Sequence, residues 1–402
     1  MAISAETNEQ RLNGISKTNG RTPSSSQPSA VNSAFVLKEK GHFYYEDRPK
    51  PSLPSEDYVI VKVCCTGICG SDVHYWTHGE IGDFKVRQPL VLGHESTGIV
   101  QECGSAVKTL KPGDRVALEP GTPCRRCEFC RAGRYNLCTT MKFAATPPYD
   151  GTLATFYTLP EDFCYLLPEH VTLEEGALIE PLSVAVHCAR LADLSFGLSV
   201  LVLGAGPIGL LCCAVARAYG ASNVTVVDIN AGRLAFAKDY AATAVYQMNS
   251  VSADENARRI MKMPGLTDGA KVVIDATGAQ QCISTGIHVL KHGGIFIQAG
   301  LGAAEIAFPV AQLCSKEATY RGSFRYGPGD YQMAIELLQQ RKLSVKELIT
   351  DKFDFDQAEM AFRHVEQRRG IKTVIYGPNN TLGAYHGSTH AETQNFQIRS
   401  PE

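Results

Sequence analysis

The segment Ser199–Gly209 has the sequence SVLVLGAGPIG, and it decides how the rest of the chain is interpreted. Val200–Leu203 is a continuous apolar run, as expected for a strand buried on both faces of a parallel sheet. A G-x-G-x-x-G pattern follows at once and opens a helix-like stretch that ends at Gly220. In this strand–turn–helix context the pattern predicts dinucleotide binding, because the glycines let the backbone approach a pyrophosphate at the positive end of the helix.

The acid after the next strand indicates which dinucleotide is bound. Asn223–Val227 is a second buried strand, and it ends in Asp228, nineteen residues after the last glycine. A carboxylate at this point accepts hydrogen bonds from both hydroxyls of a ribose and repels a 2′-phosphate. The sequence therefore predicts NAD in preference to NADP. Arg233 lies close enough to weaken this preference, although we expect it to flank the adenine ribose.

Two further segments continue the predicted parallel sheet. Lys271–Gly278 and Gly293–Leu301 each have a strand-like apolar run that leads into a glycine-containing loop. Ligands bind at the carboxyl edge of such sheets. We therefore expect only the loop ends, Thr277 and Ala299–Leu301, to face a cofactor, and the remaining residues to be core.

A separate stretch, PCRRCEFCRAGRYNLC, contains Cys124, Cys127, Cys130 and Cys138. Four thiolates this close together predict a tetrahedral Zn²⁺ site. An iron–sulfur cluster is the rival, but its bacterial signature ends C-x3-C-P, whereas here the last gap is seven residues and Thr139 follows. A disulfide pair is disfavoured because nothing in the sequence indicates export. A zinc site closed by four cysteines has no position for a substrate, so we expect it to be structural.

Catalytic chemistry is expected at a second set of potential ligands, which are of mixed type. Cys69, His94, Glu95 and Glu180 offer one thiolate, one imidazole and two carboxylates. Catalytic zinc takes three protein ligands and keeps one position open. Taken singly, each residue has an ordinary interpretation: a cysteine beside glycines is a tolerated small residue, and a His-Glu pair is a polar surface pair. The nucleotide-binding unit further along the chain favours the catalytic interpretation.

The overall composition excludes several classes of protein. The 402 residues predict two or three domains, and a net charge of -2 gives no reason to expect a nucleic acid or a membrane as partner. The local cluster Arg125, Arg126, Arg131 and Arg134 would suit a nucleic-acid zinc finger, but no His-x3-5-His pair follows it. No apolar run is long enough to cross a membrane, and the N-terminus has no apolar secretory region. We expect a cytoplasmic protein with reduced cysteines.

The C-terminal part of the chain has a different character. Asp356–Glu359 has the pattern of a capping box and leads a predicted helix that Gly370 ends. Ile371–Tyr376 is then a predicted strand, which we expect to rejoin the N-terminal β-rich part. The predicted fold is thus α/β, with a doubly wound parallel sheet inserted into a β-rich domain.

Several motifs together resemble the zinc-containing medium-chain dehydrogenases. They are GICGSDVHYW, LGHESTG, the four-cysteine stretch, ALIEPLSV, LGAGPIGL and GSFRYG. The chain is most similar to the sorbitol, xylitol and L-arabinitol dehydrogenases, over about residues 34–378. The resemblance implies a GroES-like catalytic domain, a Rossmann domain that binds NAD, two zinc ions per subunit and a homotetramer. The implied organisation is a disordered extension (1–33), a GroES-like part (34–185), a Rossmann domain (186–325), a second catalytic part (326–378) and a disordered tail (379–402).

The resemblance also implies roles for individual residues. Cys69, His94 and Glu95 correspond to ligands of the catalytic zinc, and Glu180 to an acid that binds the zinc directly or through water. Ser71 and His74 would relay the alcohol proton to solvent, unless they are a structural hydroxyl and a surface residue. Substrate-binding residues are expected at Tyr75, Glu180, Arg325 and Tyr326. Coenzyme-binding residues are expected at Gly204, Gly206, Pro207, Ile208, Gly209, Asp228, Ile229, Arg233, Thr277, Ala299, Gly300, Leu301, Ser323, Phe324 and Arg325.

The activity implied is transfer of a hydride from a secondary alcohol of a polyol to NAD. Relatives that prefer L-arabinitol tend to carry phenylalanine where Tyr75 stands, so the tyrosine favours sorbitol or xylitol. We expect sorbitol, oxidised at C2 to fructose, with xylitol as the alternative and L-arabinitol as a weaker one. A zinc-free or non-catalytic relative of the same fold is disfavoured because Cys69, His94 and Glu180 are all present. A metal-dependent binding protein without turnover is a third possibility, which NADH absorbance with sorbitol as substrate would decide.

Overall fold

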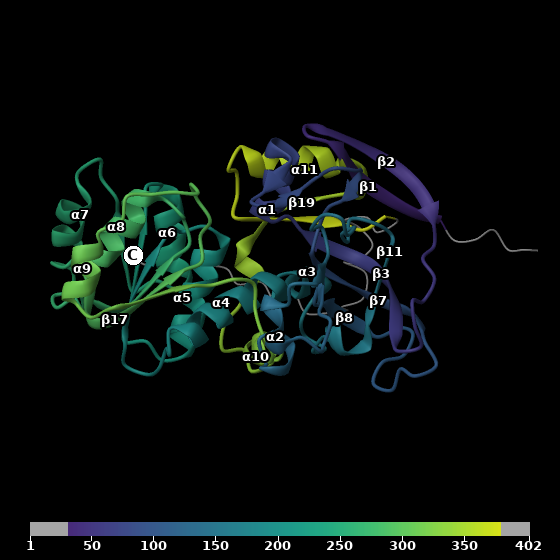
Figure 1. Cartoon of the computed structure of the whole chain (residues 1–402), viewed down its shortest axis with the longest axis horizontal. Helices are drawn as coiled ribbons and strands as arrows, with labels where there is room; N and C mark the ends of the chain where they lie inside the picture. The colour runs from purple at the N-terminus through teal and green to yellow at the C-terminus, as the bar shows by residue number, and fades with distance from the viewer. Residues whose placement is uncertain (1–30, 379–402) are drawn as a thin grey trace, which may run out of the picture.

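The computed structural model describes residues 31–378, which form two lobes joined along their middle (Figure 1). The lobe on the right of Figure 1 contains the first part of the chain and its last strands, and the lobe on the left contains the parallel sheet. Of the predicted disordered extensions, residues 379–402 and 1–30 lie outside the described part. Residues 31–33 are an exception, because they begin strand β1.

The right-hand lobe is built on a seven-stranded sheet with the order β12-β8-β7-β3-β20-β19, in which β11 also pairs with β3. Its strands are β3 (Tyr58–Gly67), β7 (Glu95–Cys103), β8 (Arg115–Leu118), β11 (Phe156–Pro160), β12 (Cys164–Leu166), β19 (Ile349–Phe353) and β20 (Lys372–Tyr376). A three-stranded sheet of β1 (Val31–Glu39), β2 (His42–Pro49) and β6 (Leu90–Val91) lies beside it, together with two short hairpins, β4 (Glu80–Ile81) with β5 (Phe84–Lys85) and β9 (Gly121–Thr122) with β10 (Lys142–Phe143). Its helices are α1 (Gly70–His78), α2 (Glu128–Arg131), α3 (Leu173–Ala177), α4 (Ile179–Leu191), α10 (Asp330–Gln339) and α11 (Ala358–Glu366), with 3-10 turns at Tyr135–Leu137, Glu161–Phe163, Lys346–Leu348 and Phe355–Gln357.

The left-hand lobe is a six-stranded parallel sheet with the order β15-β14-β13-β16-β17-β18. Its strands are β13 (Ser199–Leu203), β14 (Asn223–Asp228), β15 (Ala244–Gln247), β16 (Ala270–Asp275), β17 (Leu290–Gln298) and β18 (Thr319–Gly322). Its helices are α5 (Pro207–Ala218), α6 (Ala231–Tyr240), α7 (Ala253–Ile260), α8 (Gln280–Val289) and α9 (Val310–Ser315). Val200–Leu203 is fully buried, as expected for a central strand with helices on both faces. The predicted doubly wound sheet is confirmed.

The last strand returns the chain to the first sheet. Residues Val374–Tyr376 of β20 pair antiparallel with Cys65–Gly67 of β3, as the sequence predicts. The parallel sheet is therefore inserted between two segments that share one β-sheet. The predicted domain boundary at residue 186 falls inside α4, which runs without interruption from the catalytic lobe toward the parallel sheet.

The helix before that last strand differs from the prediction at both ends. The capping box is formed by Asp354 and Gln357, on a 3-10 turn that precedes α11. The predicted pair, Asp356 and Glu359, was placed two residues too late, because the helical turn begins earlier in the chain. At the other end α11 stops at Glu366, and the left-handed residue that closes it is Arg368, with φ 57°. Gly370, the predicted stop, lies two residues further on and is also left-handed, with φ 62°.

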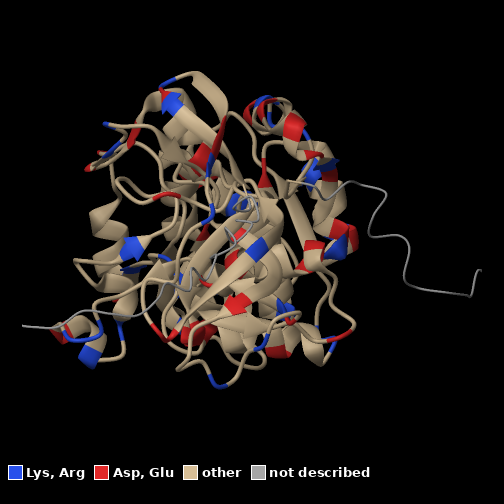
Figure 2. Cartoon of the chain, turned by 90° about the vertical axis from the view of Figure 1, so that its right-hand side faces the viewer, with Lys and Arg blue, Asp and Glu red and all other residues tan. Residues whose placement is uncertain are grey.

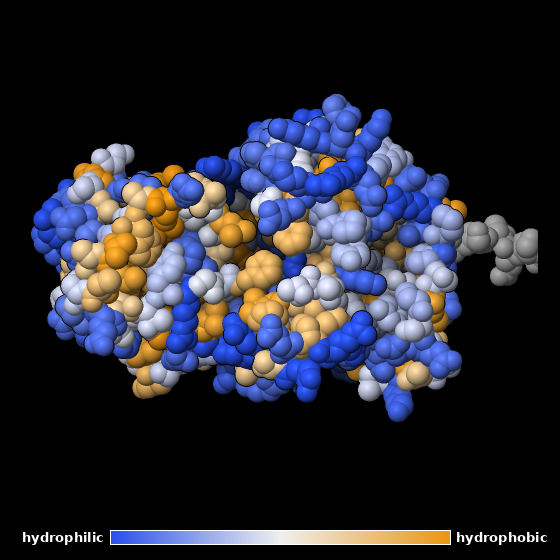
Figure 3. Space-filling model, in the orientation of Figure 1, coloured by the Kyte–Doolittle hydropathy of each residue, from blue (hydrophilic) through white to orange (hydrophobic). Residues whose placement is uncertain are grey.

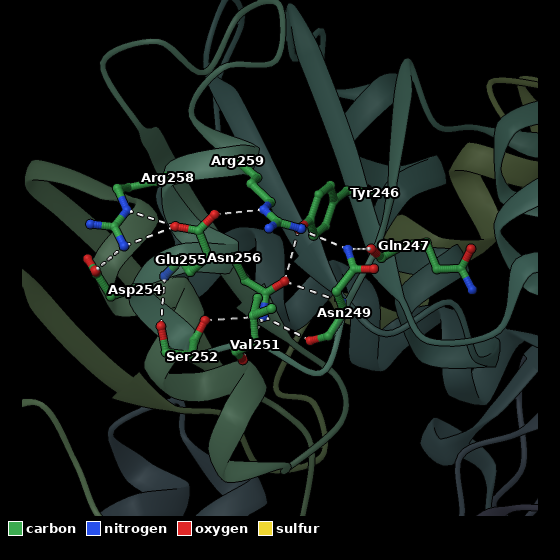
Figure 4. Close-up of polar contacts among 10 residues, drawn as sticks. All are labelled: Tyr246, Gln247, Asn249, Val251, Ser252, Asp254, Glu255, Asn256, Arg258 and Arg259. Atoms are coloured by element: carbon green, nitrogen blue, oxygen red, sulfur yellow. Dashed lines mark hydrogen bonds and ion pairs between the residues drawn. The ribbon is translucent and has the colours of Figure 1, made fainter.

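A buried asparagine holds the loop between β15 and α7 (Figure 4). Asn256 is fully buried and donates to the carbonyl oxygens of Asn249 and Val251 at 3.1 and 3.2 Å. Its own amide oxygen accepts from the Tyr246 hydroxyl at 2.9 Å. These bonds satisfy the buried amide, as a buried polar group requires. They fix the segment that begins with Met248 at the sheet's carboxyl edge.

Figure 2 shows one end of the molecule, where Lys and Arg are interspersed with Asp and Glu among the described residues. This mixed distribution agrees with the net charge of -2. Among the helices of residues 31–378, none combines the length and the apolar character that crossing a membrane would require.

Candidate active site and coenzyme cavity

Cys69, His94 and Glu95 come together although they belong to different elements. Cys69 is the residue that caps α1, and the other two lie where the chain enters β7. One ligand atom from each of the three lies within 4.8 Å of the others. His94 and Glu95 are buried, and Cys69 is partly exposed. The structure thus gathers one sulfur, one nitrogen and one oxygen ligand around a single point.

A buried acid next to Cys69 orients the imidazole. The Asp72 carboxylate lies 3.4 Å from Nδ1 of His94 and accepts hydrogen bonds from the amides of Cys69 and Gly93 at 3.1 and 3.0 Å. Because Nδ1 faces Asp72, Nε2 is the nitrogen left for a metal. Carboxylates in this position fix the tautomer and the ring direction of metal-binding histidines. Asp72 was not among the predicted site residues, although it lies inside the motif that contains Cys69.

The C-terminal strand contributes a cation to the same place. Lys372 of β20 forms a buried ion pair with Glu95, and its ammonium group donates to the carbonyl of Ile68 at 3.0 Å. The space is so restricted that a Cβ atom at Gly67 would collide with the Glu95 carboxylate and the Lys372 side chain. Only glycine fits at this point of β3. Lys372 was also missed by the sequence analysis, because it lies far along the chain in a segment without a motif.

Glu180 lies beside this group without being part of its closest cluster. It occupies the first turn of α4, where a carboxylate is favoured by the helix dipole. Burial raises the pKa of Glu180 to about 7; the nearby His94 opposes this shift and Glu95 adds to it. The Tyr326 hydroxyl is buried next to Glu180 and interacts with its carboxyl group. The two side chains thus place a hydroxyl and a carboxyl group together in the buried space beside the metal ligands.

The residues fit a zinc ion. Thiolate, imidazole and carboxylate are the three ligand types that Zn²⁺ uses in proteins. Glu95 and Glu180 are both buried, with 1% and 6% of their surface exposed, in the same small space as the Cys69 thiol. Burying so many anionic groups is unfavourable unless positive charge compensates for them, and a divalent cation would supply that charge.

The predicted substrate residues form a second cluster next to the metal ligands. The Arg325 guanidinium lies 3.7 Å from the ring centre of Phe143 and donates to the Thr146 hydroxyl at 3.4 Å. Tyr75 is buried beside them, and burial raises the pKa of Tyr75 to about 12, so its hydroxyl stays protonated. Phe143 and Thr146 belong to the cluster but were not predicted, since neither lies in a recognisable motif.

The two predicted relay residues lie on α1. Ser71 is partly exposed and His74 is exposed. The His74 ring stacks on that of His78, with 4.2 Å between ring centres, and partial burial followed by the charge of His78 lowers the pKa of His74. His74 is thus an exposed residue in the middle of α1. No direct hydrogen bond joins Ser71 to His74 among the contacts of the described residues.

The four-cysteine stretch folds into a separate lobe. The sulfur atoms of Cys124, Cys127, Cys130 and Cys138 all lie within 4.8 Å of one another, and no disulfide is formed. Two of the sulfur–sulfur distances are 3.4 and 4.0 Å, close to the separation of about 3.8 Å expected for thiolates around a tetrahedral zinc. Hydrogen bonds from backbone amides, first that of Arg126 and then that of Cys127, lower the pKa of Cys124 to about 6. The lobe fits a second, fully protein-bound zinc.

A cavity of about 420 Å³ lies at the carboxyl edge of the parallel sheet. Its lining includes six of the predicted coenzyme residues, which are Gly204, Gly206, Asp228, Ile229, Arg233 and Thr277. The Asp228 carboxylate accepts from the amides of Ala205 and Asn230 at 2.7 and 2.8 Å, which holds it over the mouth of the glycine turn. Pro207, Ile208, Gly209, Ala299, Gly300, Leu301, Ser323, Phe324 and Arg325 do not line this cavity. Their assignment to the coenzyme stays a prediction.

Several residues of this cavity were not predicted. Val227, Met248, Ala276, Ala279, Cys282 and Arg368 complete its lining. Most of them adjoin the predicted strands and loops, so their neighbours in the sequence were a signal. Arg368 is different, because it belongs to the segment after α11 in the other lobe. In the space-filling view, apolar side chains gather in the middle of the molecule, where the two lobes meet (Figure 3).

Comparison with known proteins agrees with this geometry. Residues 55–169 match the model of the alcohol dehydrogenase GroES-like domain, and residues 207–340 match that of the zinc-binding dehydrogenases. D-xylulose reductase A of Aspergillus oryzae is 58% identical over 349 residues, which cover 87% of this chain and 98% of the relative. The chain belongs to the zinc-containing medium-chain dehydrogenases.

Solved structures of this family superimpose on the whole described fold. An alcohol dehydrogenase from Escherichia coli CFT073 in complex with NADH has a TM-score of 0.79 at 25% identity, over 86% of this chain and 99% of that one. A Sinorhizobium meliloti 1021 dehydrogenase of the zinc-binding type, bound to NADP, has a TM-score of 0.77 at 27% identity, over 86% and 99%. These matches show the same two-domain fold in relatives that bind NADH and NADP.

Proposed function

We propose that the protein is an NAD-dependent xylitol dehydrogenase, which oxidises a secondary hydroxyl of xylitol to give D-xylulose. The sequence alone favoured sorbitol, with xylitol as the alternative. The relative that is 58% identical is a D-xylulose reductase, and this supports the alternative over sorbitol. The polyol substrate class is supported by the buried hydrogen-bonding side chains next to the metal ligands, which are the Tyr326 hydroxyl with Glu180 and the Arg325 and Tyr75 donors.

Cys69, His94 and Glu95 would hold the catalytic zinc, with Glu180 near enough to bind it directly or through a water molecule. When bound, a zinc ion polarises the oxygen of an alcohol and favours loss of its proton. The protein's own contribution is to fix the ligands in place: Asp72 orients His94, and Lys372 holds Glu95. Because the ligands come from three separate segments, this geometry exists only in the folded chain.

The polar residues next to the metal ligands would orient the polyol. A polyol has several hydroxyl groups, and a site that hydrogen-bonds each of them rejects analogues that lack one. Tyr326 and Glu180 would bind hydroxyls close to the reacting carbon, and Arg325, Thr146 and Tyr75 those further away. Burial of these groups excludes water from the place where the hydride moves from the polyol carbon to the nicotinamide.

The hydroxyl proton must leave while the hydride goes to NAD. We propose that Ser71 and His74 carry it along α1 toward solvent, since Ser71 is partly exposed and His74 is exposed. No hydrogen bond joins the two in residues 31–378, so the relay needs the bound coenzyme or water between them. The products balance as one ketone, one reduced coenzyme and one proton.

The substrate assignment is tested by steady-state kinetics with purified enzyme. We expect kcat/KM for xylitol to exceed that for sorbitol and L-arabinitol, with NAD as coenzyme and NADH absorbance as the signal. A higher kcat/KM for sorbitol would instead support sorbitol as the substrate, as the sequence alone predicted. No turnover of any polyol by zinc-loaded enzyme would leave only a non-catalytic member of the family.

Coenzyme choice is tested at Asp228. Combining Asp228→Ala with Ile229→Arg exchanges a repelling carboxylate for an attracting charge, so use of NADP should rise relative to NAD. Both residues line the cavity, and neither is near the metal ligands. If the unaltered enzyme already prefers NADP, our interpretation of Asp228 is wrong.

Two further expectations remain proposals. A homotetramer is expected from the resemblance to the family, and analytical ultracentrifugation would measure it. A cytoplasmic location is supported by the free state of all fourteen cysteines, which agrees with a reducing compartment.

A further inference from the structure

One residue of the catalytic lobe is part of the lining of the coenzyme cavity. Arg368, in the turn after α11, lines the cavity together with Asp228, Ile229 and Arg233. The Arg233 guanidinium, which belongs to α6 of the parallel-sheet lobe, donates to the carbonyl oxygen of Arg368 at 3.4 Å. The two arginines therefore meet across the boundary between the lobes, next to the acid predicted to bind the adenosine ribose.

The backbone at Arg368 has an unusual conformation for its residue type. The Arg368 amide donates to the carbonyl of Val365 at 2.9 Å, and the next amide, that of Arg369, donates to His364 at 3.2 Å. This is the Schellman arrangement at a helix C-terminus, in which glycine normally occupies the left-handed position. Here arginine occupies it, with φ 57°. Glycine would adopt this conformation without strain.

Another helix of this chain ends in the same way away from the cavity. At the end of α10, Arg341 is left-handed with φ 54°, its amide donates to Leu338 at 3.0 Å, and the amide of Lys342 donates to Leu337 at 2.9 Å. Arg341 is exposed and does not line the coenzyme cavity. Left-handed arginine alone is thus no sign of a ligand; the position of Arg368 in the cavity is the second, independent observation.

We propose that Arg368 is a coenzyme-binding residue, which covers the adenosine half of the bound dinucleotide and so joins the catalytic lobe to the coenzyme. A guanidinium stacks on flat aromatic rings such as adenine and donates hydrogen bonds in its own plane. Asp228 binds the ribose from the parallel-sheet lobe, while Arg368 approaches from the other lobe. The coenzyme is then held by both lobes at its adenosine end as well as at the nicotinamide. This inference rests on the proposed use of NAD.

The variant Arg368→Gly tests the proposal without threatening the fold. Glycine suits the left-handed position, so the melting temperature should stay the same or rise. The dissociation constants of NADH and of ADP-ribose, measured by fluorescence and calorimetry on the zinc-loaded enzyme, should both rise by about five-fold or more. Arg341→Gly is the matched control, and its affinities should equal those of the unaltered enzyme.

The result that overturns the proposal is an Arg368→Gly protein that binds ADP-ribose as tightly as the unaltered enzyme. An effect limited to NADPH would also overturn it, since it would assign Arg368 to a 2′-phosphate. Failure of the unaltered enzyme to bind NADH would refute the proposed function, and this inference would fall with it. A loss of affinity in Arg368→Gly alone, with NADH bound normally by the Arg341→Gly control, supports it.

Discussion

The mixed-ligand site and the four-cysteine lobe both bring metal-binding side chains together, but the chain assembles them in opposite ways. The four cysteines of the lobe lie between Cys124 and Cys138, so their spacing alone brings them together. The mixed-ligand site takes Cys69 from the start of α1, His94 and Glu95 from the entry to β7, and the supporting Lys372 from β20. The four-cysteine lobe is formed by one short segment, whereas the active site combines segments that are far apart in the sequence. Removing a ligand should therefore affect stability in one case and chemistry in the other.

The largest expected effect is at Cys69. Cys69→Ser removes the one thiolate of the mixed-ligand site, so catalytic zinc should be lost and activity should fall by about a thousand-fold or more, since polarisation by the metal supplies several kcal/mol. NADH binding should persist, because the coenzyme cavity lies in the parallel-sheet lobe. Metal content and NADH fluorescence measure the two outcomes. Full activity in zinc-depleted Cys69→Ser protein would end this mechanism.

The matched change in the four-cysteine lobe is Cys127→Ser. Structural zinc contributes folding free energy, so we expect the melting temperature to fall by roughly 10 °C, with one zinc lost and residual activity at low temperature. Differential scanning calorimetry and metal analysis provide the measurements. Mild chelation of the unaltered enzyme should remove the partly open catalytic zinc first. If both serine variants lost activity equally and neither lost stability, the two sites would not differ as we describe.

A smaller effect is expected from the acid that supports His94. Asp72→Asn keeps the shape of the side chain but removes the charge that faces Nδ1 of His94. Partners of this kind contribute about 10- to 100-fold to metal affinity or activity. The affinity of the mixed-ligand site for zinc, measured by competition with a chelator, should decrease by a factor in that range. The four-cysteine lobe should keep its zinc. An unchanged affinity would mean that packing alone orients the imidazole.

The smallest predicted effect concerns the choice among polyols. Tyr75→Phe removes one hydroxyl next to Arg325 and Thr146, and loss of a single hydrogen bond corresponds to about a five-fold change. We expect kcat/KM for xylitol and sorbitol to fall relative to that for L-arabinitol, with both zinc ions retained. Simple monoalcohols should stay poor substrates. A constant ratio across the polyols would remove Tyr75 from the specificity argument.

The same contrast explains what the sequence could predict. The cysteine lobe, the glycine turn and Asp228 are all encoded by spacing within short segments, and their neighbours in the chain are their neighbours in space. Cys69, His94 and Glu180 were found because each lies in a recognisable motif. Lys372, Phe143 and Thr146 have no such motif, and only the fold brings them to the site. Arg368 could not be predicted, because a glycine two residues later is the more obvious helix stop.

The pairing of β20 with β3 has a consequence for how the enzyme is made. Lys372 meets the residue before Cys69 across 304 residues of sequence, so the active site stays incomplete until β20 has been translated. At typical rates of synthesis this delay is roughly 15 to 60 s. During that time the parallel-sheet lobe can already fold, while the end of β3 still lacks its pairing with β20. Ribosome-bound chains that stop before β20 should therefore leave the Cys69 thiol reactive toward alkylating reagents, and completed chains should protect it.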